Sequence, residues 1–565
     1  MKLDLSHKML YSCIMADQVR VHGGRGFPNV GIRRKKLPAG MAAVVVGVLG
    51  LAGCSTDYYK ADADKEVYRI IDDKWQEDFG SKTNYRISDV SAGPNDVRVE
   101  PAQEVRGVLS LAEVVALATA HSREYQTQRE NLYLSALGLT LDRHEFAPQF
   151  LGLFGGSYTR SASDESVALN AELGFNQLLA DGARISTRVG SDWLRFLTGD
   201  PRTSLGSVLS ATVSQPLLRG AGRKIVQENL TQAERDMLYE IRAFNRYRQE
   251  FVVNIVAQYY DVLQLRDEVK NAQDNYDSLS YIHERMEMMA QAGRVEPLRA
   301  DEARQNKLEA GDRFIQAQEN YKQQLDRFKI TLGLPTEAAI ELDPNELTAL
   351  EAIEITDPNY EGQALIEIAQ EHRLDLVNSR DQLADAERKI AIAADNLGVE
   401  LNLVGSAGVR SEEGVRFARL QFDEGTYALG FDGDLNLDRK SERNAYRQAL
   451  ISLSRQRRTY ERAVDDVIFD VRQRYRDLGE TTARYRIRQL SLDLARQRME
   501  GESLKLEAGR AVTRDLLDAQ EALLQSQNNR TSAMVSYIIA KLNFYRDLGV
   551  LQVRPDGLWE YEELW

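Results

Sequence analysis

Two carboxylates near the C-terminus, Asp515 and Asp518, have a spacing suited to electrostatic work. They lie three residues apart in a segment without helix breakers, so both side chains fall on one face of a helix. A glycine break, Ala508-Gly509-Arg510, comes just before them. Carboxylates repeated by symmetry around a constriction favour cations through their field alone. The plain alternative is an acidic, solvated helix face in a chain whose net charge is -14.

Cys54 is the second candidate for chemistry. A basic cluster, Arg33-Arg34-Lys35-Lys36, is followed by the apolar run Met41 to Leu51 and then by Ala52-Gly53-Cys54. This run is too short for a bilayer, which needs about 20 residues. The ending resembles the bacterial lipobox, whose cysteine is lipidated and begins the mature chain. We expect residues 1–53 to be a signal peptide and Cys54 to carry lipid; a plain secretory peptide or a chance apolar run remains the alternative.

No other residues form a pattern typical of catalysis or metal binding. The only other cysteine, Cys13, would be removed with the signal peptide, which leaves no thiol for a disulfide, zinc or a nucleophile. The histidines lack metal-ligand spacing, and no serine lies in a nucleophile elbow. Gly220-Ala221-Gly222-Arg223-Lys224 lacks the remaining glycine and the Lys-Ser or Lys-Thr pair of a phosphate loop. We predict no enzyme activity, no cofactor and no bound metal.

The elements that must position these residues are mostly long helices. With 12 prolines in 565 residues, the chain contains long stretches without a helix breaker. Four expected helices span Ser110 to about Ala147, Arg223 to Gln291, Pro297 to Leu332 and Gly362 to Leu397. A fifth runs for roughly 70 residues from Asp438 to the break at Gly509, and a sixth follows it and ends at Leu548. Ile255, Val262, Val269 and Tyr276 recur every seven residues, which is typical of helices packed side by side. The acidic charge argues against nucleic acid as a partner.

Two regions alternate with a period of two and are expected to be strands, about 149–214 and 399–437. The first region is much longer than the second and has room for an extra hairpin, so the number of strands per chain stays open. In the second region the apolar residues from Tyr427 to Leu437 face one way, over a length that suits a membrane strand of about 9 to 11 residues. Residues 54–108 are polar and are expected to form an extended, weakly structured lead.

The chain is duplicated. Gly293 and Gly509 both lie in Ala-Gly-Arg turns, and from there the two segments align without a gap to Leu332-Gly333 and Leu548-Gly549. Each half has the order helix, strands, long helix, turn, helix. A strand edge in contact with lipid is not tolerated, so closure of so few strands would require further copies of the chain.

This order of elements, with Gln215-Pro216-Leu217-Leu218 and the paired turns, resembles the TolC family of outer-membrane efflux proteins in its lipidated branch. The resemblance covers about residues 109–550, with repeats at 109–345 and 362–550, a linker at 346–361 and a tail at 551–565. It implies a mainly α fold with a β-barrel portion: a homotrimer whose twelve strands form an outer-membrane barrel, continued by a long periplasmic α-helical barrel.

The resemblance also implies site residues and partners. Asp515 and Asp518 would line the periplasmic pore entrance. A periplasmic adaptor, itself joined to an inner-membrane transporter, would dock at the helix-hairpin tips, which are Ala292, Gly293, Arg294, Ala508, Gly509 and Arg510; turn geometry alone is the alternative for these residues. In the family a tyrosine and an arginine hold the entrance closed. Here Leu506 stands in place of the tyrosine, and Arg510 is one residue early.

The function that follows is a passive exit duct of a tripartite efflux or type I secretion system, lipid-anchored in the bacterial outer membrane with its helical barrel in the periplasm. The alternative is a lipid-anchored periplasmic coiled coil without a pore. A scaffold of that kind has no use for alternating strands of membrane length.

Overall fold

The computed structural model describes residues 55–76, 79–80, 82, 84–87, 107–162, 164–196, 203–352, 355, 361–412, 419–435, 437–508, 513–554 and 559–561. The chain divides into two units, residues 1–70 and 71–565, and each is described by itself. Cys54 and the expected signal peptide lie outside the described residues.

The described part of the first unit is helical. Helix α2 spans Thr56–Lys74, so the expectation of an extended segment is wrong here. The sequence signal for this helix is the apolar spacing of Val67, Ile70 and Ile71, which recur at i, i+3 and i+4.

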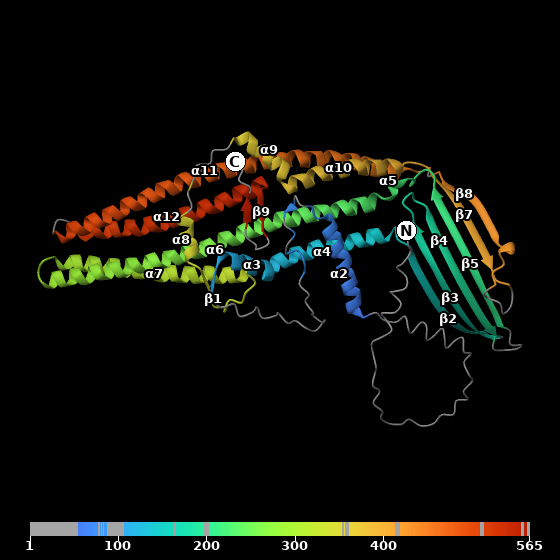
Figure 1. Cartoon of the computed structure of the whole chain (residues 1–565), viewed down its shortest axis with the longest axis horizontal. Helices are drawn as coiled ribbons and strands as arrows, with labels where there is room; N and C mark the ends of the chain where they lie inside the picture. The colour runs from blue at the N-terminus through green and yellow to red at the C-terminus, as the bar shows by residue number, and fades with distance from the viewer. Residues whose placement is uncertain are drawn as a thin grey trace, which may run out of the picture. The chain divides into compact units, whose positions relative to one another are not determined.

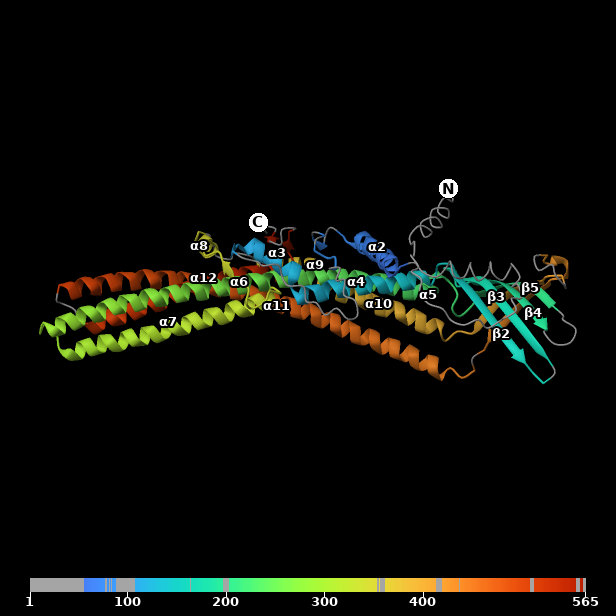
Figure 2. The ribbon, with the colours of Figure 1, turned by 90° about the horizontal axis from the view of Figure 1, so that it is seen from below.

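Two long antiparallel helical hairpins dominate the second unit (Figure 1). The first consists of α6 (Glu228–Gln291) and α7 (Pro297–Thr331), and the second of α11 (Lys440–Glu507) and α12 (Thr513–Leu548). The 64 residues of α6 correspond to about 100 Å at 1.5 Å per residue. In Figures 1 and 2 the C-terminal ends of α6 and α11 lie at the same end of the unit, away from the sheet.

Each repeat begins with a pair of shorter helices of matching length. These are α3 (Leu111–His121) and α4 (Arg123–His144) in the first repeat, and α9 (Gly362–His372) and α10 (Leu374–Asp395) in the second. The capping box expected at Ser110 is confirmed, because its side chain and that of Glu113 exchange hydrogen bonds with backbone N–H groups.

The expectation of one continuous helix at the start of each repeat is wrong. The first helix is interrupted at Ser122 (φ -61°, ψ 127°) and the second at Arg373 (φ -71°, ψ 109°), both in extended conformation. The physical reason is tertiary: each interruption lies where the glycine that ends the last helix of that repeat meets the backbone, Gly333 at His121 and Gly549 at His372.

A six-stranded antiparallel sheet lies at the other end of the long helices. Its order is β2-β3-β4-β5-β7-β8. The strands are β2 (Gln149–Arg160), β3 (Glu165–Leu178), β4 (Arg184–Phe196), β5 (Thr203–Pro216), β7 (Glu400–Arg410) and β8 (Thr426–Asp434). Both strand regions were thus predicted correctly, but β8 ends three residues before Leu437. The first region supplies four strands and the second only two.

Two small sheets lie near the middle of the unit. Strands β1 (Gly107–Leu109) and β6 (Ile340–Leu342) pair in parallel, and β9 (Leu551–Val553) and β10 (Trp559–Tyr561) form a hairpin. The short helices are α5 (Arg223–Val226), α8 (Asn345–Glu351) and the 3-10 turn η2 (Phe422–Glu424).

The core of this region is aromatic. Tyr125 of α4 contacts Phe244 and Phe251 of α6, and Tyr259 of α6 contacts Phe328 of α7. All five side chains are buried, and each aromatic ring removes 150–250 Å² from water. Among the described helices, none has the length and apolar character that a membrane span requires.

Candidate functional site

The turn between α6 and α7 is a rigid, fully exposed tip. Gly293 has φ +70°. The N–H of Arg294 donates to the carbonyl of Met289 at 2.9 Å, five residues back, and the N–H of Gly293 donates to Ala290 at 3.0 Å. This is the Schellman pattern, which satisfies the last carbonyls of a helix and needs a left-handed residue. Ala292, Gly293 and Arg294 are therefore presented to solvent by a defined backbone.

The turn between α11 and α12 is described only at its two sides. Ala508 follows α11 and is exposed, and α12 begins at Thr513. Gly509 and Arg510, the other two residues predicted at this tip, lie outside the described residues.

Asp515 and Asp518 lie together on the exposed face of the first turn and a half of α12. The residues between them, Leu516 and Leu517, are 4% and 7% exposed and point the other way. Because the two leucines fix the rotation of the helix, both carboxylates must face out. No ion pair joins either carboxylate to a cation in the part of the chain that the structure describes.

An apolar cluster holds the two hairpins together near their tips. Leu516 and Leu517 contribute from α12, and the remaining buried members come from the first hairpin: Leu279, Ile282, Met286, Ala303 and Ala310. Leu506 of α11 packs against this cluster. Arg313 of α7 also forms an ion pair with Glu521 of α12. The position of the Asp515–Asp518 face is thus set by both repeats.

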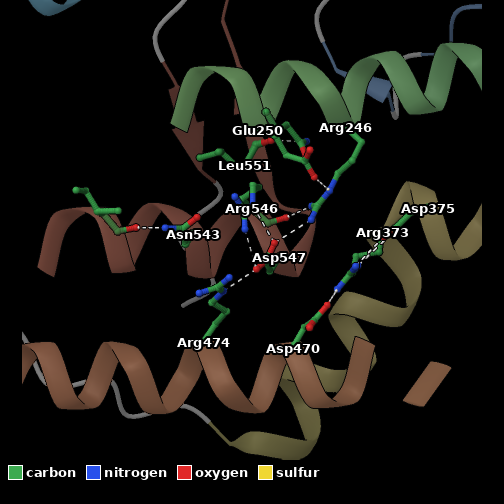
Figure 3. Close-up of polar contacts among 12 residues, drawn as sticks. Arg246, Glu250, Arg373, Asp375, Asp470, Arg474, Asn543, Arg546, Asp547 and Leu551 are labelled. Carbon is green, nitrogen blue, oxygen red and sulfur yellow. Dashed lines mark hydrogen bonds and ion pairs between the residues drawn. The ribbon is translucent and has the colours of Figure 1, made fainter. Parts of the chain in front are cut away.

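Farther along α12, three arginines converge on the carboxylate of Asp547 (Figure 3). Arg246 of α6 donates to Oδ1 at 2.8 Å, Arg474 of α11 donates to Oδ2 at 2.9 Å, and Arg546 donates to both oxygens at 2.9 and 3.0 Å. The side chain of Asp547 is only 7% exposed. This cluster joins the first repeat to both long helices of the second.

The charges of this cluster determine how Asp547 ionises. Burial alone would raise the pKa of the Asp547 carboxyl, but hydrogen bonds and charge from Arg546, Arg246 and Arg474 outweigh it and hold the pKa well below its usual value. Sequence reasoning did not identify this cluster. A signal existed, because an aspartate in the last turn of a helix opposes the helix dipole unless cations hold it there.

The sheet gathers most of its large apolar side chains on one face and all the charged residues of β3, β7 and β8 that the register places near its middle on the other. Following the register, one face carries Phe150, Phe154 and Tyr158 of β2; Leu169, Leu173 and Phe175 of β3; Ile185, Val189 and Trp193 of β4; Leu205, Leu209 and Val213 of β5; Leu401 and Leu403 of β7; and Tyr427, Leu429 and Phe431 of β8. The other face carries Asn170, Glu172, Arg188, Asp192, Ser210, Asn402, Asp432 and Asp434, interspersed with small residues and with Leu151, Leu153, Leu194, Val208 and Val404. One face suits lipid and the other suits water.

The long helices also expose large apolar side chains at heptad spacing. These pairs are Tyr281 and Met288 on α6, Leu308 and Ile315 on α7, and Ile487 and Leu494 on α11. Each of these side chains is more than half exposed. Such stripes are typical of a coiled-coil seam whose partner helix is not present in the single chain.

In the described ranges no three His, Cys, Asp or Glu side chains come together in a group that could hold a metal ion. What the geometry offers is two wall-like surfaces, one of sheet and one of helices, and an exposed acidic face near one end.

Comparisons with known proteins give a match to a family model over part of the chain and a likeness of fold to solved structures. Residues 140–334 match the family model described as outer membrane efflux protein. No curated protein matches the sequence. Among solved structures, the chain is similar to the CmeC outer membrane channel of Campylobacter jejuni (TM-score 0.57, 15% identity, covering 78% of this chain and 85% of that one).

Two further channels show the same likeness. The outer membrane protein VceC of Vibrio cholerae has a TM-score of 0.54 at 14% identity, covering 78% of this chain and 96% of that one. The open state of the MtrE outer membrane channel of Neisseria gonorrhoeae has a TM-score of 0.56 at 15% identity, covering 83% and 98%. At these identities the likeness establishes a shared fold.

Proposed function

We propose that this chain, of which residues 140–334 match the outer membrane efflux protein family model, forms the outer-membrane exit duct of a tripartite export system. In this role it conducts substrates passively from the periplasm or from an inner-membrane pump to the exterior. The transport energy comes from that pump, since a duct only provides the path.

The observation that carries this proposal is the two-faced sheet with two free edges. Its strands are 9 to 14 residues long, which is enough to cross a bilayer. In the described residues, β2 and β8 each pair on one side only. A free edge in lipid costs several kcal/mol for each unpaired backbone group. Joining β8 of one copy to β2 of the next removes every edge when the ring closes.

The exposed helix stripes support the same assembly. Second copies of the chain would cover Tyr281, Leu308 and Ile487 and their heptad partners, and so continue the wall from the sheet into the helices. Three copies, as the family resemblance implies, give a homotrimer with a closed barrel above and a helical tunnel below.

The remaining assignments place the duct between its partners. Asp515 and Asp518 form stacked rings of three carboxylates at the periplasmic entrance and favour cations. The tips at Ala292, Gly293, Arg294 and Ala508, together with Gly509 and Arg510, dock a periplasmic adaptor. Lipid on Cys54 anchors the N-terminus in the outer membrane.

Conductance in planar bilayers tests the channel itself. We expect purified full-length protein to give discrete current steps. Protein that inserts but never conducts would contradict the duct and leave a lipid-anchored scaffold as the better account.

Crosslinking in cells tests adaptor docking. A cysteine at Arg294 is expected to crosslink to the adaptor, whereas a matched cysteine at Gln305, exposed on α7 but two turns or more from the tip, is not. Failure of the Arg294 variant to crosslink while export continues would mean that the turn is structural only.

A further inference from the structure

The two strand regions are not equivalent, and the repeat shows which strands are additional. Strand β2 follows α4 as β7 follows α10, and β5 leads into the α6 segment as β8 leads into α11. Strands β2 and β5 are therefore the counterparts of β7 and β8. Strands β3 and β4 form a hairpin inserted between β2 and β5, and β2 and β5 are consequently separated in the sheet.

The inserted hairpin has every property of the barrel wall. Strand β3 pairs with β2 along 12 positions from Gln149 to Arg160, and β4 pairs with β5 along 12 positions from Arg184 to Arg195. Its strands of 14 and 13 residues are longer than β2, β7 and β8, which have 12, 11 and 9 residues. Leu169, Leu173, Val189 and Trp193 continue the apolar face without a break, and Asn170, Glu172, Arg188 and Asp192 continue the polar face.

We propose that three copies close into a barrel of eighteen strands, in which all six strands of each chain contact lipid on one face and the bore on the other. This inference rests on the trimeric duct proposed above. Alternation of direction along the sheet makes β2 and β8 antiparallel, so β8 of one copy can pair with β2 of the next in the ladder type used throughout.

The number of strands sets the width of the outlet. With strands about 4.8 Å apart and tilted by about 40°, eighteen strands give a backbone diameter of about 36 Å and twelve strands about 24 Å. The cross-section is therefore roughly doubled. Barrels of 16–18 strands leave an aqueous channel. The insertion adds no helix, since α4, α6, α10 and α11 have the same roles in each repeat.

The consequence is an outlet wider than the helical tunnel that feeds it. Size selection then falls to the helical part and to the Asp515–Asp518 face, and the barrel admits solutes from outside that cannot travel the full length of the duct. The barrel end therefore does not limit the size of the solutes that pass through the duct.

Electron cryomicroscopy of the intact protein in lipid counts the strands directly. Eighteen strands in a closed ring are expected. A ring of twelve, with Glu165 to Phe196 projecting from the wall, would overturn this inference and leave the duct intact. A protein without a ring would instead contradict the proposed function.

Polymer access measures the width separately. Neutral polymers added on the barrel side of a bilayer are expected to lower the current up to a size cutoff. Replacing residues 161–202 with an Asn-Gly turn joins β2 to β5 at the end away from the helices, and we expect the cutoff diameter to fall about 1.5-fold. Polymers added on the helix side serve as the control and are expected to show the same cutoff in both proteins. An equal cutoff on the barrel side in both proteins would contradict the wide outlet; loss of all current in the unaltered protein would contradict the duct.

Discussion

The α-carbon of Gly549 lies against the backbone of His372, so closely that a Cβ on the glycine would come within 2.8 Å of the carbonyl carbon and 2.9 Å of the carbonyl oxygen. Gly333 meets His121 in the same way in the first repeat. In each repeat the end of the last helix is thus locked onto the end of the first. Because the same close contact occurs at equivalent positions of both repeats, it supports the duplication inferred from the sequence.

Replacing Gly549 with alanine is expected to destabilise the fold by roughly 3 kcal/mol. The positive φ of +81° costs about 1–2 kcal/mol for an L-residue, and the clash with backbone atoms adds to this because backbone cannot give way cheaply. Gly293→Ala is the matched control: φ is +70° but nothing lies within 4 Å of the new Cβ, so only the first cost applies. Chemical denaturation of both variants measures the difference in their free energies of unfolding. Equal losses of stability would mean that the contact with His372 is unimportant.

Neutralising the acidic face is expected to change ion selectivity without changing assembly. Asp515→Asn with Asp518→Asn removes six carboxylates from a trimer. A unit charge about 4 Å away is worth about 1 kcal/mol in water, so the cation-to-anion permeability ratio should fall about fivefold. Asp301→Asn, an exposed carboxylate near the tip of the other hairpin, is the control and should leave the ratio unchanged. Reversal potentials in a salt gradient measure it, and an unaltered ratio in the double variant would remove these residues from the entrance.

The Asp547 cluster is expected to make the fold sensitive to acid. The folded pKa of Asp547 lies below the usual value, which is about 3.9. Its ionised form therefore stabilises the fold above pH 3.9, and this contribution is lost as the pH falls toward the folded pKa. Asp547→Asn should cost about 3 kcal/mol at pH 7, since it leaves three arginines without their carboxylate.

The pH dependence separates this effect from simple loss of packing. The difference in unfolding free energy between Asp547→Asn and the unaltered protein should shrink as the pH is lowered below about 4. Glu319→Gln, which removes a highly exposed pair with Lys322, should cost less than about 1 kcal/mol at any pH. A cost for Asp547→Asn that does not vary with pH would show that the arginines do not act through its charge.

How far the sequence predicts this structure depends on the range of the interactions. Long helices and strands follow from local periodicity, so Pro297 begins α7 and Gly293 ends the α6 segment as expected. The interruptions at Ser122 and Arg373 have no local signal, because they are imposed by glycines some 200 residues away along the chain. The prediction of an extended segment was wrong at α2. It gave the scattered aspartates more weight than the apolar spacing of Val67, Ile70 and Ile71.

The same distinction applies to the candidate site. The shared exposed face of Asp515 and Asp518 follows from their spacing, and the structure adds that Leu516 and Leu517 fix its direction. The Asp547 cluster draws its partners from α6 and α11, so no window of the sequence contains it. The sequence indicates the inserted hairpin only through the unusual length of the first strand region. Its position between β2 and β5 follows from the strand pairing in the structure.

Charging the exposed stripe of α11 is expected to prevent assembly while leaving the single chain stable. Leu490 and Leu494 are 61% and 56% exposed, so Leu490→Glu with Leu494→Glu should change the stability of a monomer by about 0.5 kcal/mol or less. In an assembly the same charges would be buried against a neighbouring copy. Native mass spectrometry should show trimers for the control Arg496→Glu, because Arg496 is exposed but lies two residues, or about 200° around the helix, from Leu494. It should show single chains for the double variant. Trimers in both would place the interface elsewhere.

Closure of the sheet edges is tested most directly by disulfide trapping in membranes. Cysteines placed in turn at Leu151, Leu153 and Ser157 of β2, each combined with Gly430→Cys in β8, scan the register between copies. Gly190→Cys with Gly430→Cys is the control, since β4 is an interior strand too far from any β8 for a disulfide. We expect a covalent product of three chains for at least one β2 position and none for the control. Single chains alone at every β2 position would contradict it.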